Sequence, residues 1–561
     1  MPTISVIRQD LERLAGRKYD LSELERALEA VKAEVKVEDD SRLRIQLKDT
    51  NRPDLWSSEG VARLLRGHRN GRHESYPFFE ESATDLELRV NSSLKGIRPY
   101  IAAFACKGIE VDGAALEQLI EAQEKLAEGY GRGRSAVAIG IYDASNVLFP
   151  VNFAAADPDT ARFVPLGMET ELTLREILSE HPTGQTYAHL LEGFGRFPLI
   201  TDSRGDVLSM PPVINSRNPG AVEVGDSFLF CEATGTELDA VLLSVSIMAT
   251  NMADRGGSIL PVNVVYPYDT PRGREILCPL DMTEPVEVNL NDLRHVIGGG
   301  IDNASIEAAL AAMGYRDVGL DPTGVRARPA PYRDDILHPV DLIEDVIVAA
   351  GFDSFEPELP RDFTVGKSAP EEDLADRIRG LMVGCGFQEL FLPILSSRVD
   401  LTERMRDTDA AIVEISNPMS ENYSAVRNAL LPGLLRVEGA SRKALYPHHV
   451  FEVGEVSVIA PDDLYGTRTE IRLAALEAHA EANLSGIQSH LEAIAYYLGF
   501  DYDLTPSEHP TFLPGRAGEI RVDGESYGII GEIHPAVLEN WSVSVPVSAF
   551  EVNVDIARLQ P

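Results

Sequence analysis

The chain has 561 residues, which is more than one hydrophobic core supports, so we expect three to five domains. Its 51 basic and 89 acidic residues give a formal net charge of −38, which repels polyanions at long range. Any contact with nucleic acid therefore requires a local basic patch or a more basic partner.

Two further classes of protein are disfavoured by the composition. No stretch approaches the roughly 20 apolar residues of a membrane span, and residues 1–14 lack the apolar segment of a signal peptide. The four cysteines lie far apart without a CxxC pair, which indicates neither a disulfide framework nor a zinc knuckle. We therefore expect a cytoplasmic protein that does not span a membrane.

The first segment combines helix and strand. Apolar residues at helical spacing predict a helix over 21–31, with Asp20 as its N-cap. Alternating apolar and charged residues predict a strand over 42–48, and a second helix is expected over 57–67. We interpret 1–85 as an N-terminal α/β domain.

Four arginines recur at every third position in this segment, with no acidic residue between them. In so acidic a chain, such a run is typical of a patch that binds RNA phosphates. It is equally typical of a helix C-terminus, where the helix dipole favours cations. Both interpretations stay open for Arg63, Arg66, Arg69 and Arg72.

Residues 88–268 form an α+β block, with a helix over 116–126, a buried strand over 137–143 and a long apolar helix within 227–257. The sequence GRGR at 131–134 lacks the GK[ST] ending of a phosphate loop, so we expect a turn there. The chain has no nucleophile elbow, HExxH motif or class I synthetase signature. The motifs therefore predict no ATP chemistry of its own.

A compact unit over 270–362 contains an acidic segment, RDDILHPVDLIEDV, which begins at Arg333. Asp341, Glu344 and Asp345 share one face of a predicted helix, because they are spaced i, i+3 and i+4. Their mutual repulsion is relieved by a hard cation such as Mg²⁺, by Arg333 or by cations of a partner chain. On spacing alone, a charged and solvated helix face is the favoured interpretation.

The last block, 363–561, begins with a helix that Ser368 and Pro370 introduce. Several segments with the pattern of antiparallel strands follow it. The chain contains no internal repeat, low-complexity tract or coiled-coil heptad pattern.

Four segments in a fixed order carry a resemblance to a known family. They are KDTNRPDLWSSEGVARLLRG, HPTGQTYAHLLEGFGRFPLITDSRGDVLSMPPVIN, PYRDDILHPVDLIEDVIVAAGFDSF, and ISNPMSENYSAVRNALLPGLL followed by HHVFEVGEV. The chain resembles the β subunit of phenylalanyl-tRNA synthetase, in its shorter archaeal and eukaryotic form. The resemblance implies an α subunit that activates phenylalanine with ATP, an (αβ)2 heterotetramer and the charging of tRNA-Phe.

The resemblance also implies a multidomain α+β fold. Residues 88–268 correspond to an editing domain that hydrolyses tyrosine mistakenly attached to tRNA-Phe, and 270–362 to a winged-helix-like domain. Residues 363–561 correspond to a class II synthetase-like antiparallel sheet domain that contacts the α subunit. This last domain lacks catalytic motifs, because HHVFEVGEV carries no arginine where a class II enzyme binds ATP.

A metal site follows from the resemblance. It implies a structural Mg²⁺ site at four carboxylates whose spacing is D, +6, +9 and +10. In this chain those residues are Asp335, Asp341, Glu344 and Asp345.

An editing pocket follows from it as well. The implied lining residues are Ile200, Ser209, Glu232 and Thr234. The family has Leu and Asp at the first and third of these positions, so the pocket here combines a different branched side chain with a longer carboxylate. A water molecule is expected to attack the aminoacyl ester.

Two other functions stay open at this point. One is a freestanding deacylase that acts in trans without an α subunit, and the other is a scaffold subunit with a vestigial editing site. The complete series of domains, including the block over 363–561, favours the synthetase subunit.

Overall fold

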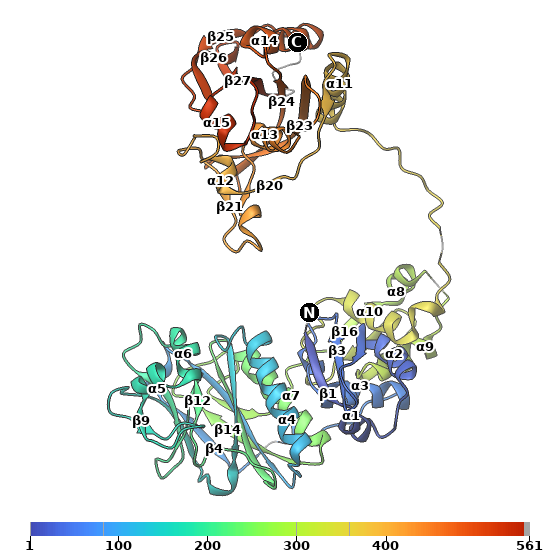
Figure 1. The fold of residues 1–561 in the computed structure, drawn as a ribbon. Coiled ribbons are helices and arrows are strands. Elements are labelled where there is room, and N and C mark those ends of the chain that lie inside the picture. Colours follow the sequence, from blue (N-terminus) through green and yellow to red (C-terminus); the bar gives the residue numbers. More distant parts are fainter. Residues whose placement is uncertain (1, 82, 299, 358, 442, 555–561) are drawn as a thin grey trace. The chain divides into compact units, whose positions relative to one another are not determined.

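The computed structural model describes residues 2–81, 83–298, 300–357, 359–441 and 443–554. The chain forms two compact units, 1–358 and 359–561 (Figure 1). It is an α+β protein with several sheets, as the sequence predicts. Within the described ranges, no helix is long and apolar enough to cross a membrane.

A three-stranded antiparallel sheet begins the first unit. Its elements are β1 (Thr3–Ile7), α1 (Arg8–Ala15), α2 (Leu21–Leu28), β2 (Ala33–Val37), β3 (Arg42–Leu47) and α3 (Ser58–Asn70). The strand order is β1-β3-β2. The predicted N-cap of α2 is confirmed, because the Asp20 side chain accepts a hydrogen bond from the Glu23 amide at 2.7 Å. Alternate residues of β3 are buried, as its apolar period predicts.

A ten-stranded sheet dominates the first unit. Its strands are β4 (Glu87–Val90), β5 (Tyr100–Lys107), β6 (Val137–Asp143), β7 (Val151–Ala156), β10 (Phe197–Thr201), β11 (Val207–Met210), β12 (Ile214–Asn215), β13 (Phe228–Gly235), β14 (Ser258–Val265) and β15 (Glu275–Cys278). Their spatial order is β12-β11-β10-β7-β4-β14-β5-β13-β6, with β15 beside β14. Within the described part of this sheet, only β4 pairs in parallel, with β7 and β14. A small hairpin of β8 (Arg162–Phe163) and β9 (Leu172–Thr173) precedes α5 (Leu174–Glu180) and α6 (Pro182–Tyr187).

Two helices pack beside this sheet, α4 (Gly113–Lys125) and α7 (Leu238–Asp254) (Figure 1). The long apolar helix α7 is buried along most of its length, because it packs against β5 and β13 and also contacts α3. The predicted domains 1–85 and 88–268 consequently share one continuous hydrophobic core.

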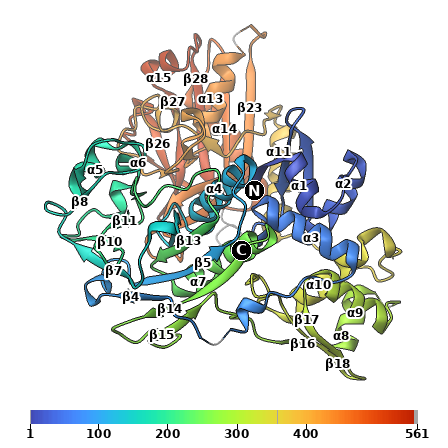
Figure 2. The same ribbon diagram turned by 90° about the horizontal axis from the view of Figure 1, so that it is seen from below.

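The third part of the first unit has its own core. It contains β16 (Val286–Asn289), α8 (Leu290–Ile297), α9 (Asn303–Ala312), β17 (Arg316–Leu320), β18 (Gly324–Arg328) and α10 (Pro339–Ala350). The strands form an antiparallel sheet in the order β16-β18-β17, and Figure 2 shows the three helices gathered around it. Leu293, Leu310 and Leu342 lie fully buried between sheet and helices.

The second unit is built on a seven-stranded sheet in the order β19-β23-β24-β28-β27-β26-β25. Its main elements are α11 (Pro370–Gly384), β19 (Gln388–Glu389), α13 (Leu431–Ala440), β23 (His448–Ile459), β24 (Thr467–Ala478), α14 (Leu484–Leu498), β25 (Asp503–Pro506), β26 (Phe512–Val522), β27 (Glu525–Ile533), α15 (Pro535–Asn540) and β28 (Val547–Asn553). Its neighbouring strands pair antiparallel except β19 with β23. The predicted helix starts at Pro370, but its N-cap is Ala369 rather than Ser368.

Smaller elements complete this unit. A three-stranded antiparallel sheet in the order β20-β22-β21 accompanies the short helix α12. These are β20 (Leu395–Ser396), α12 (Arg398–Leu401), β21 (Val413–Glu414) and β22 (Ala425–Val426). The main sheet has a core on each face, one with α11 and α14 and the other with α13.

Candidate functional site

A cavity of about 270 Å³ opens beside β6 and β13 in the large sheet. Helix α4 and the turn between β11 and β12 contribute further walls. Three of the four predicted pocket residues line this cavity, namely Ser209, Glu232 and Thr234. The fourth, Ile200, is not among the lining residues. It is buried in the hydrophobic core and pairs directly with Ser209 where β10 lies beside β11.

The strand register brings the polar groups of the cavity together. Glu232 and Thr234 share one face of β13, since alternate residues of a strand point to the same side. Gly140 on β6 lies directly opposite Glu232. A Cβ atom at position 140 would lie 2.2 Å from the Tyr142 hydroxyl and 2.5 Å from Glu232 Oε1. Only glycine leaves room there for both polar groups.

Tyr142 connects the two predicted residues Ser209 and Glu232. Its hydroxyl lies 2.8 Å from Glu232 Oε1 and 2.9 Å from Ser209 Oγ. A phenol carries one proton, so Tyr142 donates to the carboxyl group and accepts from the Ser209 hydroxyl. All three side chains are buried. Burial and the nearby carboxylate raise the pKa of Tyr142 well above its usual value, so the phenol stays protonated.

Glu232 keeps one oxygen available. Within the described part of the chain, its Oε2 atom is buried without a hydrogen-bond partner. Burial raises the pKa of the Glu232 carboxyl to about 8, although the Tyr142 hydroxyl and the charge of Arg98 act in the opposite direction. At neutral pH the carboxyl group is therefore mostly protonated, and it can donate or accept at this oxygen.

Arg98 holds Thr234 in place from the opposite side. Its Nε donates to Thr234 Oγ1 at 2.9 Å, and its Nη2 donates to the Thr234 carbonyl at 2.6 Å. Burial lowers the pKa of Arg98, and the nearby Glu232 carboxylate opposes that shift.

The sequence analysis did not predict roles for Arg98 and Tyr142. For Tyr142 a signal existed, since it places a hydroxyl in the otherwise apolar, buried part of strand β6, before Asp143. Arg98 had no local signal, because its partner Thr234 lies 136 positions away in the sequence.

In the acidic segment, each of the four predicted metal ligands already has a partner within the protein. Arg333 pairs with Asp335 at 2.5 Å and with Asp345 at 2.7 Å. Asp341 is the third residue of α10 and accepts hydrogen bonds from two backbone amides that precede the helix, at 2.8 and 2.7 Å. Glu344 forms an ion pair with Lys32. Neutralisation by Arg333, one of the alternatives that the sequence left open, is therefore present.

These four carboxylates do not fit a Mg²⁺ site in this arrangement. Among the described residues, no three of them offer ligand oxygens within 4.8 Å of one another. The buried guanidinium of Arg333 supplies the positive charge between Asp335 and Asp345, where Mg²⁺ would require several oxygen ligands at about 2.1 Å.

Titration with Mg²⁺ tests this arrangement. We expect millimolar Mg²⁺ to leave the melting temperature of the protein unchanged after treatment with EDTA, because Arg333 already neutralises the buried carboxylates. Differential scanning fluorimetry measures this, with K⁺ at the same ionic strength as the control. A Mg²⁺-specific rise that Asp335→Asn abolishes would contradict it.

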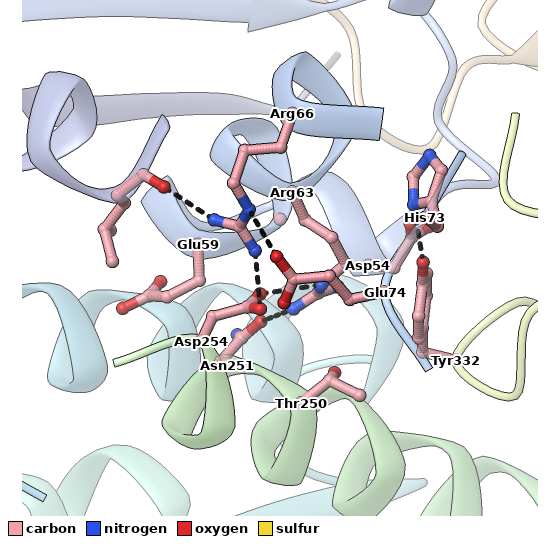
Figure 3. Close-up of polar contacts among 12 residues, drawn as sticks. Asp54, Glu59, Arg63, Arg66, His73, Glu74, Thr250, Asn251, Asp254 and Tyr332 are labelled. Carbon is pink, nitrogen blue, oxygen red and sulfur yellow. Dashed lines mark hydrogen bonds and ion pairs between the residues drawn. The ribbon is translucent and has the colours of Figure 1, made fainter. Parts of the chain in front are cut away.

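The arginine run is divided between interior and surface. Arg63 and Arg66 both pair with Asp254 at the end of α7, at 2.8 and 2.6 Å (Figure 3). Arg63 also donates to Asn251 at 2.7 Å and lies 4.5 Å from the ring centroid of Tyr332. For Arg63 the RNA interpretation is therefore wrong, since its side chain is buried, and Arg66 is committed to the same carboxylate.

The other two arginines of the run are exposed. Arg69 lies in the last turn of α3 and donates to the Ala15 carbonyl at 3.0 Å, which agrees with the helix C-terminus interpretation. Arg72 lies beyond the helix. It is the member of the run best placed to reach an RNA phosphate.

Comparison with known proteins identifies the family. The sequence model of the phenylalanyl tRNA synthetase beta chain CLM domain matches residues 356–554, and that of the tRNA synthetase B5 domain matches 286–352. The phenylalanine–tRNA ligase beta subunit of Borrelia recurrentis (strain A1) is 37% identical over 565 residues, which cover 99% of either chain. That of Pyrococcus furiosus is 40% identical over 556 residues, 98% of this chain and 99% of its own.

A solved structure agrees with these relatives. The crystal structure of an N-terminal fragment of the phenylalanyl-tRNA synthetase beta subunit from Pyrococcus horikoshii is 37% identical and has a TM-score of 0.58. The match covers 62% of this chain and 99% of the fragment. The chain belongs to the family of phenylalanine–tRNA ligase beta subunits.

Proposed function

We propose that the chain assembles with an α subunit into an (αβ)2 enzyme that charges tRNA-Phe with phenylalanine, and that its cavity hydrolyses Tyr-tRNA-Phe. The observation that carries the editing proposal is the unpartnered Glu232 Oε2 at the cavity, within the described residues. It is a polar atom that a substrate hydroxyl would satisfy.

An editing cavity is needed because a binding site for phenylalanine cannot exclude tyrosine strongly. A site shaped for phenylalanine rejects an analogue with one extra hydroxyl only modestly, on the order of 10²-fold. A second site that has a polar group for that hydroxyl selects tyrosine instead. It disfavours phenylalanine, because burying the ring there would leave the carboxyl group unpaired.

The cavity residues divide the work between recognition and positioning. The tyrosyl phenol would bind Glu232 Oε2, while Tyr142, itself hydrogen-bonded to Ser209, fixes the other oxygen of the same carboxyl group. Apolar side chains such as Leu119 and Val213 line the cavity and would contact the ring. Thr234, held by Arg98, presents its hydroxyl beside them. The reaction is attack of a water molecule on the ester carbon, which releases tyrosine and free tRNA-Phe.

The second unit supports a protein partner rather than a freestanding deacylase. It exposes large apolar side chains that an α subunit would cover. They include Phe391, Met419, Leu445, Leu464 and Tyr496, each at least 80% exposed. Arg427, which is buried, and Arg472, which is half-buried, line two different cavities of this unit and pair with carboxylates, Arg427 with Glu452 at 2.8 Å and Arg472 with Glu551 at 3.1 Å. We infer that ATP and phenylalanine bind to the α subunit, with Mg²⁺ accompanying ATP there.

Charge and compartment complete the proposal. tRNA-Phe must be attracted by local basic groups, because the chain as a whole carries −38. Arg72 is the proposed contact from the arginine run, and Arg69 can assist it from the end of α3. The proposed compartment is the cytoplasm, where charging of tRNA takes place.

Purification of the chain with and without its α subunit tests this function. The isolated chain should catalyse no phenylalanine-dependent ATP–pyrophosphate exchange, because Arg427 and Arg472 are held by its own glutamates. Co-expressed chains should elute as a heterotetramer that catalyses the exchange. Exchange by the isolated chain, or a chain that stays monomeric beside its α subunit, would contradict the proposal.

A further inference from the structure

We propose that His449, Glu477 and His479 bind a divalent transition-metal ion of the Zn²⁺ class. The three side chains meet at one end of the seven-stranded sheet, in the second unit. This site does not depend on the proposed editing activity, which concerns residues of the first unit.

The strand pairing assembles the three donors. His449 on β23 lies directly opposite Glu477 on β24. His479 follows two residues later in the chain, on the same side as Glu477, because side chains alternate along a strand. Two imidazoles and a carboxylate therefore share one face of the sheet at the point where β24 ends.

The three donors lie near enough to one another for side-chain rotations to bring them to one ion. Their ligand atoms all lie within 4.8 Å of one another. In a tetrahedral Zn²⁺ site the ligand atoms are separated by about 3.4 Å, given Zn–N and Zn–O bonds of about 2.1 Å. Rotations of the two histidine side chains, which are only half-buried, suffice to close this difference.

The surroundings of Glu477 resemble the support that metal ligands receive in other proteins. Ser548 on β28 donates a hydrogen bond to Glu477 Oε1 at 2.6 Å, which leaves Oε2 to face the histidines. Gly486 gives this carboxylate its space, since a Cβ atom there would lie 2.7 Å from Glu477 Oε1. His490 on α14 places its Nε2 atom 3.9 Å from Glu477 Oε2 and is the nearest further donor.

The donor set selects the class of ion. Two imidazole nitrogens with one carboxylate oxygen suit Zn²⁺ and its neighbours, whereas Mg²⁺ and Ca²⁺ prefer oxygen ligands throughout. Glu477, 3% exposed, supplies the negative charge.

A bound ion would connect two strands of the sheet through three side chains. It would also fix the start of the segment between β24 and α14, because His479 is the first residue after β24. We therefore assign the site a structural role at this end of the second unit.

A competition titration with Zn²⁺ tests the proposal. The full-length protein, treated with a chelator and then freed of it, should take one equivalent of Zn²⁺ from a chromophoric indicator, with a dissociation constant tighter than about 10 µM. The double variant His449→Ala/His479→Ala should bind at least about 100-fold more weakly. The matched control is His189→Ala, which removes an exposed histidine of the first unit and should bind like the wild type.

A second variant tests whether any loss of binding in the double variant comes from misfolding. Glu477→Gln keeps the shape of the side chain and its acceptor for Ser548, and we expect it to lose at least about 10-fold in affinity. With Co²⁺ in place of Zn²⁺, the wild-type protein should show the visible absorption of a tetrahedral site. The proposal is overturned if the wild-type protein takes no Zn²⁺ from the indicator, or if the double variant binds with unchanged affinity.

Discussion

Glu232→Ala should slow the hydrolysis of Tyr-tRNA-Phe by the assembled enzyme by about 10- to 100-fold. The variant removes the only group at the cavity that we assign to the tyrosyl hydroxyl. Its removal leaves the tyrosyl hydroxyl buried without a hydrogen-bond partner, which costs about 1–3 kcal/mol. Since 1.4 kcal/mol corresponds to a factor of ten in rate, a loss of one to two decades follows. Charging with phenylalanine should not change.

The chain offers a matched control for this variant. Glu124 also lines the cavity, but its side chain is exposed on α4. Glu124→Ala should hydrolyse Tyr-tRNA-Phe at close to the wild-type rate, since a solvated carboxylate has no unsatisfied atom for the substrate. Equal losses in the two variants would indicate a general effect of charge on tRNA binding and would contradict the assigned role of Glu232.

The variants Glu232→Asp and Glu232→Gln distinguish the effect of side-chain length from the effect of the charge on the carboxyl group. Aspartate shortens the side chain by one methylene, so its carboxyl group would withdraw from both Tyr142 and the cavity. Glutamine keeps the length and offers an amide at the position of Oε2. If the protonated carboxyl group is the working form at neutral pH, Glu232→Gln should retain more activity than Glu232→Asp.

Asp254→Ala should lower the free energy of unfolding of the first unit by about 3–5 kcal/mol. Asp254 is fully buried and accepts from Arg63, Arg66 and Tyr76. Its removal leaves the Arg63 guanidinium buried, with Asn251 as its remaining hydrogen-bond acceptor among the described residues. A buried charge without its counter-ion is strongly destabilising, because the interior solvates it poorly.

The measurement can be restricted to one unit of the protein. The chain has two tryptophans, of which Trp56 is buried in the first unit and Trp541 in the second. In a Trp541→Phe background, urea unfolding followed by tryptophan fluorescence reports on the first unit. The control is Asp239→Ala on the same helix, whose ion pair with Arg272 is exposed and should contribute less than about 1 kcal/mol. Equal effects of the two variants would contradict the structural role of Asp254.

Local features of the fold were predictable from the sequence. The cap at Asp20, the alternation in β3 and the apolar length of α7 each depend on neighbouring residues. The sequence predicted a domain boundary near residue 85, but the hydrophobic core continues across it. This could not be predicted, because the contact between α3 and α7 joins helices that lie far apart in the sequence. The ion pair of Arg63 with Asp254 spans 191 positions in the sequence. The spacing of the arginines therefore left an RNA-binding patch and a helix C-terminus equally open, and it could not show that Arg63 and Arg66 pair with Asp254.

The candidate site was likewise predictable only in part. The resemblance supplied Ser209, Glu232 and Thr234, and these three do line one cavity. The partners that set their chemistry, Tyr142 and Arg98, come from other strands or loops and could not be paired with them by spacing. In the acidic segment, spacing identified the carboxylates but could not decide between Arg333 and a metal ion, because that choice depends on side-chain conformation.

The most direct test of the editing proposal is hydrolysis of preformed Tyr-tRNA-Phe by the assembled wild-type enzyme, without ATP or free amino acid. Release of tyrosine should exceed the spontaneous rate and should also exceed release of phenylalanine from Phe-tRNA-Phe, because only the tyrosyl hydroxyl satisfies Glu232 Oε2. Hydrolysis of Tyr-tRNA-Phe no faster than the spontaneous rate would contradict the account and leave the chain as a scaffold with a vestigial cavity.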